Sequence, residues 1–233
     1  MRFSAPLPYH PDATAYYAAV ADLPWAVWLD SGGRGRYDII AAQPVATLVT
    51  RGKQTQIRDE SGERSSNDDP FDLLRSQLGD DLPSVPDIPF AGGVLGYWGY
   101  DLARRMVPLP AVAQDVEDLP EMAVGIYDWA LVLDHQQQSA RLVSHQRAAE
   151  TANTLPQILA RLQSATPKKR DAFHVHGQIT SNFTRATYEH AFALIQDYLR
   201  AGDCYQINLA QRFLARVSGD AFTAYCTLRE LNP

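Results

Sequence analysis

A glycine-rich turn contains the first group of side chains that could bind a small molecule. Ser31, Arg34 and Arg36 lie close together in the run Asp30–Arg36, where glycines fill the remaining turn positions. Arginine binds carboxylates through paired N–H groups, and a serine hydroxyl both donates and accepts hydrogen bonds. A turn of this composition is more often a solvated loop, because loops are usually polar and exposed. The residues alone leave both interpretations open.

A second group follows a predicted helix in the C-terminal part of the chain. Thr184 is a suitable N-cap and Gly202 a suitable helix end, and the apolar residues between them recur at three- and four-residue steps. From Tyr205 to Phe213 the period changes to two, which predicts a strand with the amides Gln206 and Asn208 on its polar face. Such amides either bond to neighbouring strands or line a small-molecule pocket.

The sequence contains no recognisable catalytic or metal-binding motif. The pair His174-Val175-His176 has no carboxylate or cysteine at metal-ligand spacing, and Ser31 does not lie in a G-x-S-x-G motif. The glycines of Phe90–Asp101 match neither spacing of a phosphate-binding loop. Glycines in such a strand-like run predict either β-bulges or a close approach of two backbones.

Alternating apolar segments joined by short connections predict an antiparallel sheet region in the first 165 or so residues. The polar run Glu63–Asp68 is predicted to be an exposed loop. The predicted strands are 25–29, 37–42, 45–50, 53–58, 122–135 and 140–144, and the predicted helices are 12–23, 69–79, 147–163, 184–202 and 220–231. This pattern predicts an α+β fold, with antiparallel sheets and flanking helices.

Composition excludes several classes of protein. The chain has 233 residues, of which 45% are hydrophobic, and its formal net charge is −6, which argues against nucleic-acid binding. It has no apolar run long enough for a membrane span and no signal-peptide pattern at its start. Its two cysteines form no C-x-x-C pair. We therefore expect a cytoplasmic protein that binds neither nucleic acid nor membrane.

The chain is predicted to contain one large domain and the beginning of another. Residues 1–165 form the first, and residues 166–182, which include Lys168-Lys169-Arg170, form a linker. Residues 183–233 begin a second domain. The sequence stops directly after a predicted helix, so we expect this second domain to be incomplete.

The two longest motifs resemble a known enzyme family. The run Gly202–Phe213 (GDCYQINLAQRF) is similar to the opening strand of the chorismate-utilising domain of anthranilate synthase component I, aminodeoxychorismate synthase component I and the isochorismate synthases. The run Phe90–Asp101 (FAGGVLGYWGYD) resembles the glycine-rich segment of the N-terminal domain in the first two groups. Leu23–Ala26, Arg36–Ile39 and Met122–Trp129 look most like the aminodeoxychorismate synthase group.

This resemblance implies an α+β fold in which two antiparallel sheets face each other, truncated before most of the catalytic domain. It implies a magnesium-dependent reaction in folate biosynthesis, in which ammonia from a glutamine amidotransferase subunit, component II, replaces the 4-hydroxyl of chorismate. The family's catalytic lysine, its acid–base carboxylate and its magnesium ligands would all lie beyond Pro233. We therefore expect no catalytic residue and no bound cofactor in this chain, and no activity of the chain alone.

The resemblance also implies an L-tryptophan pocket in the N-terminal domain. It maps onto Ser31, onto Arg34-Gly35-Arg36-Tyr37, and onto the start of a third segment at Asn232-Pro233. Arg34-Gly35 stands where the family carries an aromatic residue and a serine, and the turn is a few residues shorter than the family form. Two alternatives stay open: an anthranilate synthase component I, and a non-catalytic module that binds tryptophan or docks a partner.

Overall fold

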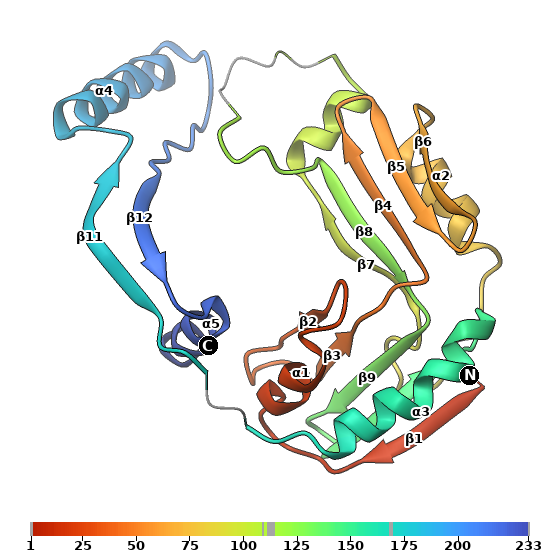
Figure 1. The fold of residues 1–233 in the computed structure, drawn as a ribbon. Coiled ribbons are helices and arrows are strands. Elements are labelled where there is room, and N and C mark those ends of the chain that lie inside the picture. Colours follow the sequence, from red (N-terminus) through yellow and green to blue (C-terminus); the bar gives the residue numbers. More distant parts are fainter. Residues whose placement is uncertain (1, 109, 111–114, 168–169, 233) are drawn as a thin grey trace. The chain divides into compact units, whose positions relative to one another are not determined.

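The computed structural model describes residues 2–108, 110, 115–167 and 170–232. The chain divides into two compact units, with the boundary between residues 168 and 169. Each unit has its own strands and helices (Figure 1). The boundary lies inside the predicted linker 166–182, but the linker prediction is wrong for residues 174–181, which form a strand.

One five-stranded antiparallel sheet of the first unit packs against two helices (Figure 1). The helices α1 (Thr14–Val20) and α3 (Ala149–Gln163) contribute Tyr16, Leu155 and Ile158 to a buried apolar cluster with the strands. Burial of such side chains is the main stabilising contribution to folding. In spatial order the strands are β1 (Phe3–Leu7), β10 (Ser139–Ser144), β9 (Trp129–Asp134), β3 (Tyr37–Ala41) and β2 (Val27–Leu29).

A second five-stranded antiparallel sheet packs against α2 (Pro70–Leu78) and a short 3₁₀ helix, η1 (Tyr100–Arg105). Asp69 accepts hydrogen bonds from the backbone at the start of α2 and is its N-cap, which confirms the helix predicted over 69–79. In spatial order the strands are β6 (Gly62–Ser66), β5 (Gln54–Asp59), β4 (Ala46–Arg51), β8 (Met122–Tyr127) and β7 (Gly93–Trp98).

The loop predicted at Glu63–Asp68 is wrong, because most of it belongs to β6, which pairs with β5. Glu63 lies opposite Arg58 in this pair, and Arg58 Nη2 is 2.6 Å from Glu63 Oε2. An edge strand can be polar on both faces when both are exposed to water, so it carries no apolar alternation in the sequence.

Two connections join the sheets, β3 to β4 and β8 to β9. The second splits the run predicted as one strand over 122–135, because the chain leaves one sheet at Tyr127 and enters the other at Trp129. Tyr127 is buried here, its hydroxyl donates to the Trp25 carbonyl at 2.8 Å, and burial raises the pKa of its phenol to about 12. The predicted strand 140–144 is confirmed as part of β10, which pairs antiparallel with β9.

The glycine-rich run holds β7 directly against β8. Gly96 has φ +153°, and a Cβ on it would lie 2.2 Å from the Ala123 carbonyl oxygen. Only glycine fits this position without moving the neighbouring strand. The interpretation of these glycines as a close backbone approach is confirmed. The sheets themselves meet in a small apolar cluster that contains Ala41, Leu95 and Tyr127.

The second unit contains the predicted C-terminal helices. Thr184 forms a capping box at the start of α4 (Arg185–Ala201), Gly202 ends it with φ +81°, and Asp220 caps α5 (Ala221–Leu231). The strands β11 (His174–Ser181) and β12 (Phe213–Ser218) pair antiparallel.

The strand predicted over 205–213 is wrong, since only Phe213 lies in a strand. Alternation of polar and apolar residues is not sufficient for a strand, because the backbone also needs a neighbouring strand to bond to. Within the part of the chain that the structure describes, β11 pairs with residues 213–218 and no strand lies beside 204–212.

The α+β class with antiparallel sheets and flanking helices is confirmed. Of the described helices, none combines the length and the hydropathy needed to cross a membrane.

Candidate functional site

The predicted glycine-rich turn lies between β2 and β3 and is held by hydrogen bonds at its start. Ser31 N donates to Asp38 Oδ1 at 2.7 Å, and Gly32 N donates to Asp30 Oδ1 at 2.8 Å. Gly32 and Gly33 have φ values of +62° and +73°, which glycine adopts without strain. The turn is therefore a defined structure anchored to the buried side chain of Asp38.

A buried polar cluster lies beneath this turn. His135 Nε2 is 3.2 Å from Asp38 Oδ2, within ion-pair range but without the alignment of a hydrogen bond, and His135 Nδ1 is 2.9 Å from the Tyr9 hydroxyl. The Ser31 hydroxyl is also buried, and it has no hydrogen-bond partner among the residues that the structure describes. A buried hydroxyl without a partner is costly, so this oxygen needs a hydrogen-bond partner that the described residues do not supply.

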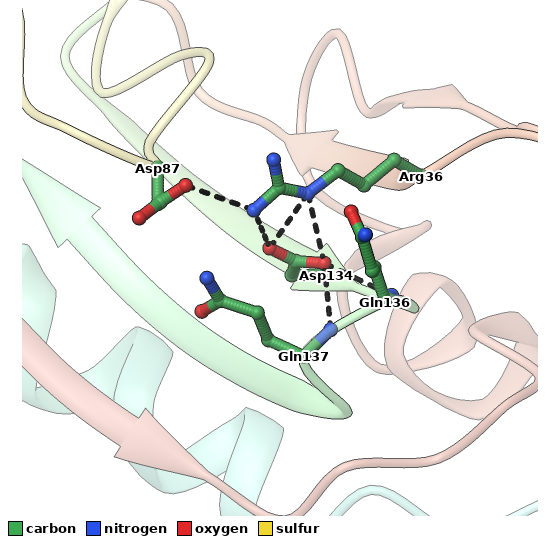
Figure 2. Close-up of polar contacts among 5 residues, drawn as sticks. All are labelled: Arg36, Asp87, Asp134, Gln136 and Gln137. Carbon is green, nitrogen blue, oxygen red and sulfur yellow. Dashed lines mark hydrogen bonds and ion pairs between the residues drawn. The ribbon is translucent and has the colours of Figure 1, made fainter.

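Arg36 is the last residue of the turn, and its guanidinium group connects it to two other segments (Figure 2). Its Nε and Nη2 donate to the carboxylate of Asp134, with Nη2 at 2.8 Å, and Nη2 also donates to Asp87 at 2.9 Å. Asp134 in addition accepts the backbone N–H groups of Gln136 and Gln137, each at 3.0 Å.

These contacts shift the titration of both partners. Hydrogen bonds to Asp134 and Asp87 raise the pKa of Arg36, and the hydrogen bond from Arg36 is the main cause that lowers the pKa of Asp134. The guanidinium carbon also lies 4.7 Å from the ring centroid of Tyr37, whose pKa is raised mainly by burial. Arg36 is therefore a charged link between β3, the end of β9 and the loop before β7.

The structure brings together some of the predicted tryptophan-site residues. A Cβ on Gly35 would lie 3.0 Å from the Ser31 Cβ, so these two positions are in close contact. Arg34 N donates to the Ser31 carbonyl at 3.1 Å, while the Arg34 side chain is exposed. Asn232 belongs to the second unit, and Pro233 lies outside the described residues.

Gln206 and Asn208 lie in an irregular, exposed segment of the second unit. Gln206 Nε2 donates to Asn208 Oδ1 at 3.3 Å. Both amides face solvent in the described unit, so the hypothesis that they line a pocket stays a prediction. Among the described residues, no group of three or more His, Cys, Asp or Glu side chains is placed to hold a metal ion.

The sequence interpretation missed Asp38, Asp134 and His135 as parts of the site. A signal was present for Asp38, because it occupies a buried position in an otherwise apolar strand, where a charged residue needs a specific partner. Asp134 and His135 end the next strand of the sheet. Their partners are about a hundred residues away in the sequence, and no local pattern connects them.

Comparison with known proteins points to one family. The chorismate binding enzyme family matches residues 25–233. The chain is 41% identical over 227 residues to aminodeoxychorismate synthase component 1 of Escherichia coli (strain K12), which covers 94% of this chain and 49% of that protein. It is 43% identical to aminodeoxychorismate synthase component 1 of Klebsiella aerogenes, with 97% of this chain and 50% of that protein covered.

Anthranilate synthases are more distant relatives. Anthranilate synthase alpha subunit 1, chloroplastic, of Arabidopsis thaliana is 29% identical, with 85% of this chain and 38% of that protein covered. The crystal structure of anthranilate synthase component I from Streptococcus pneumoniae TIGR4 matches with a TM-score of 0.72 and 25% identity, over 86% of this chain and 46% of that one. The chain spans about half the length of the curated relatives it matches.

Proposed function

The chain belongs to the family of chorismate binding enzymes, and on that premise we propose that it is the N-terminal part of an aminodeoxychorismate synthase component 1. The observation that carries this proposal is the difference in sequence identity between the chain's matches to aminodeoxychorismate synthases and its match to an anthranilate synthase. The chain is 41 to 43% identical to two enzymes of that name and 29% identical to an anthranilate synthase alpha subunit.

The reaction that we propose for the whole protein starts from chorismate and ammonia. Ammonia replaces the 4-hydroxyl group, which leaves as water, and the product is 4-amino-4-deoxychorismate for folate biosynthesis. A glutamine amidotransferase subunit, component II, supplies the ammonia, and we place the protein in the cytoplasm. Incubation of the whole protein with chorismate, ammonium and magnesium, followed by identification of the product, tests this proposal.

We assign the chemistry to the part of the protein beyond this chain. The described residues offer no set of metal ligands, so no step through magnesium is assigned to them. Gln206 and Asn208 are neutral amides near the start of the chorismate domain in the sequence. We propose that they line its pocket when that domain is complete. The 233-residue chain alone is therefore expected to be inactive.

A second proposed function is binding of L-tryptophan at the glycine-rich turn. The buried Ser31 hydroxyl, which lacks a partner among the described residues, supports it. Arg34, Gly35 and Tyr37 border the same turn and are the other candidate contacts. Because the Nε and Nη2 groups of Arg36 already bond to Asp134 and Asp87, we propose that Arg36 positions the turn.

Calorimetric titration of the whole protein with L-tryptophan tests this site. Ser31→Ala should weaken binding about tenfold, because a hydrogen bond from a buried hydroxyl contributes about 1.5 kcal/mol. Ser61→Ala, in an exposed turn of the other sheet, is the matched control and should bind as the unsubstituted protein does. Equal affinity of the two variants for L-tryptophan would contradict the proposal that tryptophan binds at this turn.

A further inference from the structure

The buried polar cluster beneath the glycine-rich turn has no role in the proposed function. His135, the residue after β9, has its Nδ1 2.9 Å from the Tyr9 hydroxyl and its Nε2 3.2 Å from Asp38 Oδ2. The other carboxylate oxygen, Asp38 Oδ1, accepts the N–H of Ser31 at 2.7 Å. The cluster therefore connects the segment between β1 and α1, through the end of β9, to the start of the turn.

Asp38 is the most deeply buried member of the cluster, with a side chain that is 0% exposed. A carboxylate that is removed from water needs a compensating charge or several hydrogen bonds. Its Oδ1 has the N–H of Ser31, whereas its Oδ2 has no hydrogen bond from any described residue. Among the described residues, His135 is the group within ion-pair range of Asp38 that can carry a positive charge.

His135 can take up a proton without losing its contact with Tyr9. Its side chain is 16% exposed, so it remains in contact with water. A tyrosine hydroxyl donates to the Nδ1 of a neutral imidazole and accepts from the Nδ1 of a charged one. The two rings also pack edge to face, with centroids 5.8 Å apart. Protonation therefore adds a charge opposite Asp38 and costs no hydrogen bond on the other side of the ring.

The other titratable and charged groups on the neighbouring elements already have partners. They are Asp134, Asp87 and Tyr37, which all contact Arg36, Asp30, which accepts a backbone N–H of the turn, and His10, whose ring centroid lies 5.5 Å from that of Tyr16. A charge acts most strongly on the nearest unpaired charge in a buried site. The proton on His135 therefore acts mainly on Asp38.

We propose that His135 is a positioning residue for the glycine-rich turn. Its protonated ring pairs with Asp38 and fixes the carboxylate that holds the N–H of Ser31. When the ring loses its proton, the buried carboxylate loses its positive partner, and the turn loses part of its support. Histidine side chains change charge between about pH 5 and 8, so the turn is held more firmly at the acid end of this range. For tryptophan binding at this turn, the inference rests on the function proposed above.

The experiment follows the backbone N–H of Ser31 by NMR in the whole protein labelled with ¹⁵N-serine, and Ser31→Ala identifies its signal. As pH falls from about 8 to 5.5, we expect this signal to shift along one titration curve, with the same midpoint as the ring signals of His135. Ser61 is the internal control, because its N–H donates to Asp59 Oδ1 at 3.0 Å in the other sheet. The cation paired with that carboxylate is Arg64, which keeps its charge, so the Ser61 signal should not follow a histidine titration.

Two variants separate the charge of His135 from its hydrogen bonds. His135→Gln keeps a side chain that donates and accepts hydrogen bonds but takes up no proton in this range, so the titration of the Ser31 signal should be lost. His10→Gln removes an exposed histidine from the segment that contains Tyr9 and should leave the curve unchanged. By calorimetry, the affinity for L-tryptophan should decrease by up to about fivefold as pH rises, because a charged hydrogen bond contributes more than a neutral one. In His135→Gln this affinity should not depend on pH.

The inference is overturned if the Ser31 signal does not titrate, if its midpoint differs from that of the His135 ring, or if His135→Gln retains the curve. If His135→Gln does not fold, the comparison of the two midpoints in the unsubstituted protein decides the question. The NMR readouts need no ligand. A Ser31 signal that titrates with His135 while L-tryptophan fails to bind would support the positioning role and contradict the tryptophan proposal, and binding of L-tryptophan without a Ser31 titration would do the reverse.

Discussion

Arg36 and Asp134, separated by 98 positions in the sequence, form an ion pair in which two guanidinium nitrogens contact one carboxylate (Figure 2). The Asp134 side chain is almost fully buried, and the pair is continued by Asp87 and by two backbone N–H groups. This ion pair connects the last residue of the glycine-rich turn to the end of β9. We therefore expect the defined structure of the turn to depend on the ion pair between Arg36 and Asp134, a residue outside the turn.

Arg36→Ala should lower the stability of the first unit, because it leaves the Asp134 carboxylate without its charged partner, while partial exposure of Arg36 limits the loss. Arg34→Ala is the matched control, since it removes an exposed guanidinium from the same turn. Urea unfolding followed by circular dichroism measures the difference. An equal effect of the two substitutions would contradict a structural role for the pair.

The pair should also make stability depend on pH on the acid side. The folded state lowers the pKa of Asp134, so its contribution is complete above the unfolded-state value of about 3.9 and is lost as pH falls through the folded-state pKa. The stability difference between the unsubstituted protein and Asp134→Asn should be constant from pH 7 to 5 and shrink below about pH 4. A difference that stays unchanged down to pH 3 would show that the carboxylate charge is not involved.

Gly96→Ala should destabilise the second sheet by at least about 2 kcal/mol, because the added Cβ would overlap the Ala123 carbonyl and φ is +153°. Gly52→Ala also has a positive φ, of +56°, but its Cβ would meet no atom within 4 Å. This control should lose only about 1 kcal/mol. Thermal melting of both variants separates backbone strain from steric overlap, and equal losses would refute the close approach of β7 and β8.

Elements with strong local signals were predictable from the sequence. The helices α2 and α4 were predicted, α4 with Thr184 and Gly202 at its ends, because capping residues act on backbone groups a few residues away. The turn with Ser31 was identified as a site candidate from its composition and from resemblance. These features depend on interactions that the sequence shows directly.

Features that depend on distant partners were not predictable. The strand β6 is polar on both faces, so the sequence pattern did not predict it. Residues 205–212 alternate between polar and apolar without a strand beside them in the described unit, so the same pattern predicted a strand that does not form. The contacts of Asp38 with His135 and of Arg36 with Asp134 join the two neighbouring strands β3 and β9. Their proximity follows from strand pairing and not from spacing in the sequence.

The product formed by the whole protein tests the central proposal most directly. The protein, including the part beyond residue 233, is incubated with chorismate, ammonium and magnesium, and the product is separated and identified by mass. Parallel reactions contain chelator in place of magnesium, or the 233-residue chain alone. We expect 4-amino-4-deoxychorismate from the whole protein and no product in either parallel reaction. Accumulation of anthranilate would contradict the proposal.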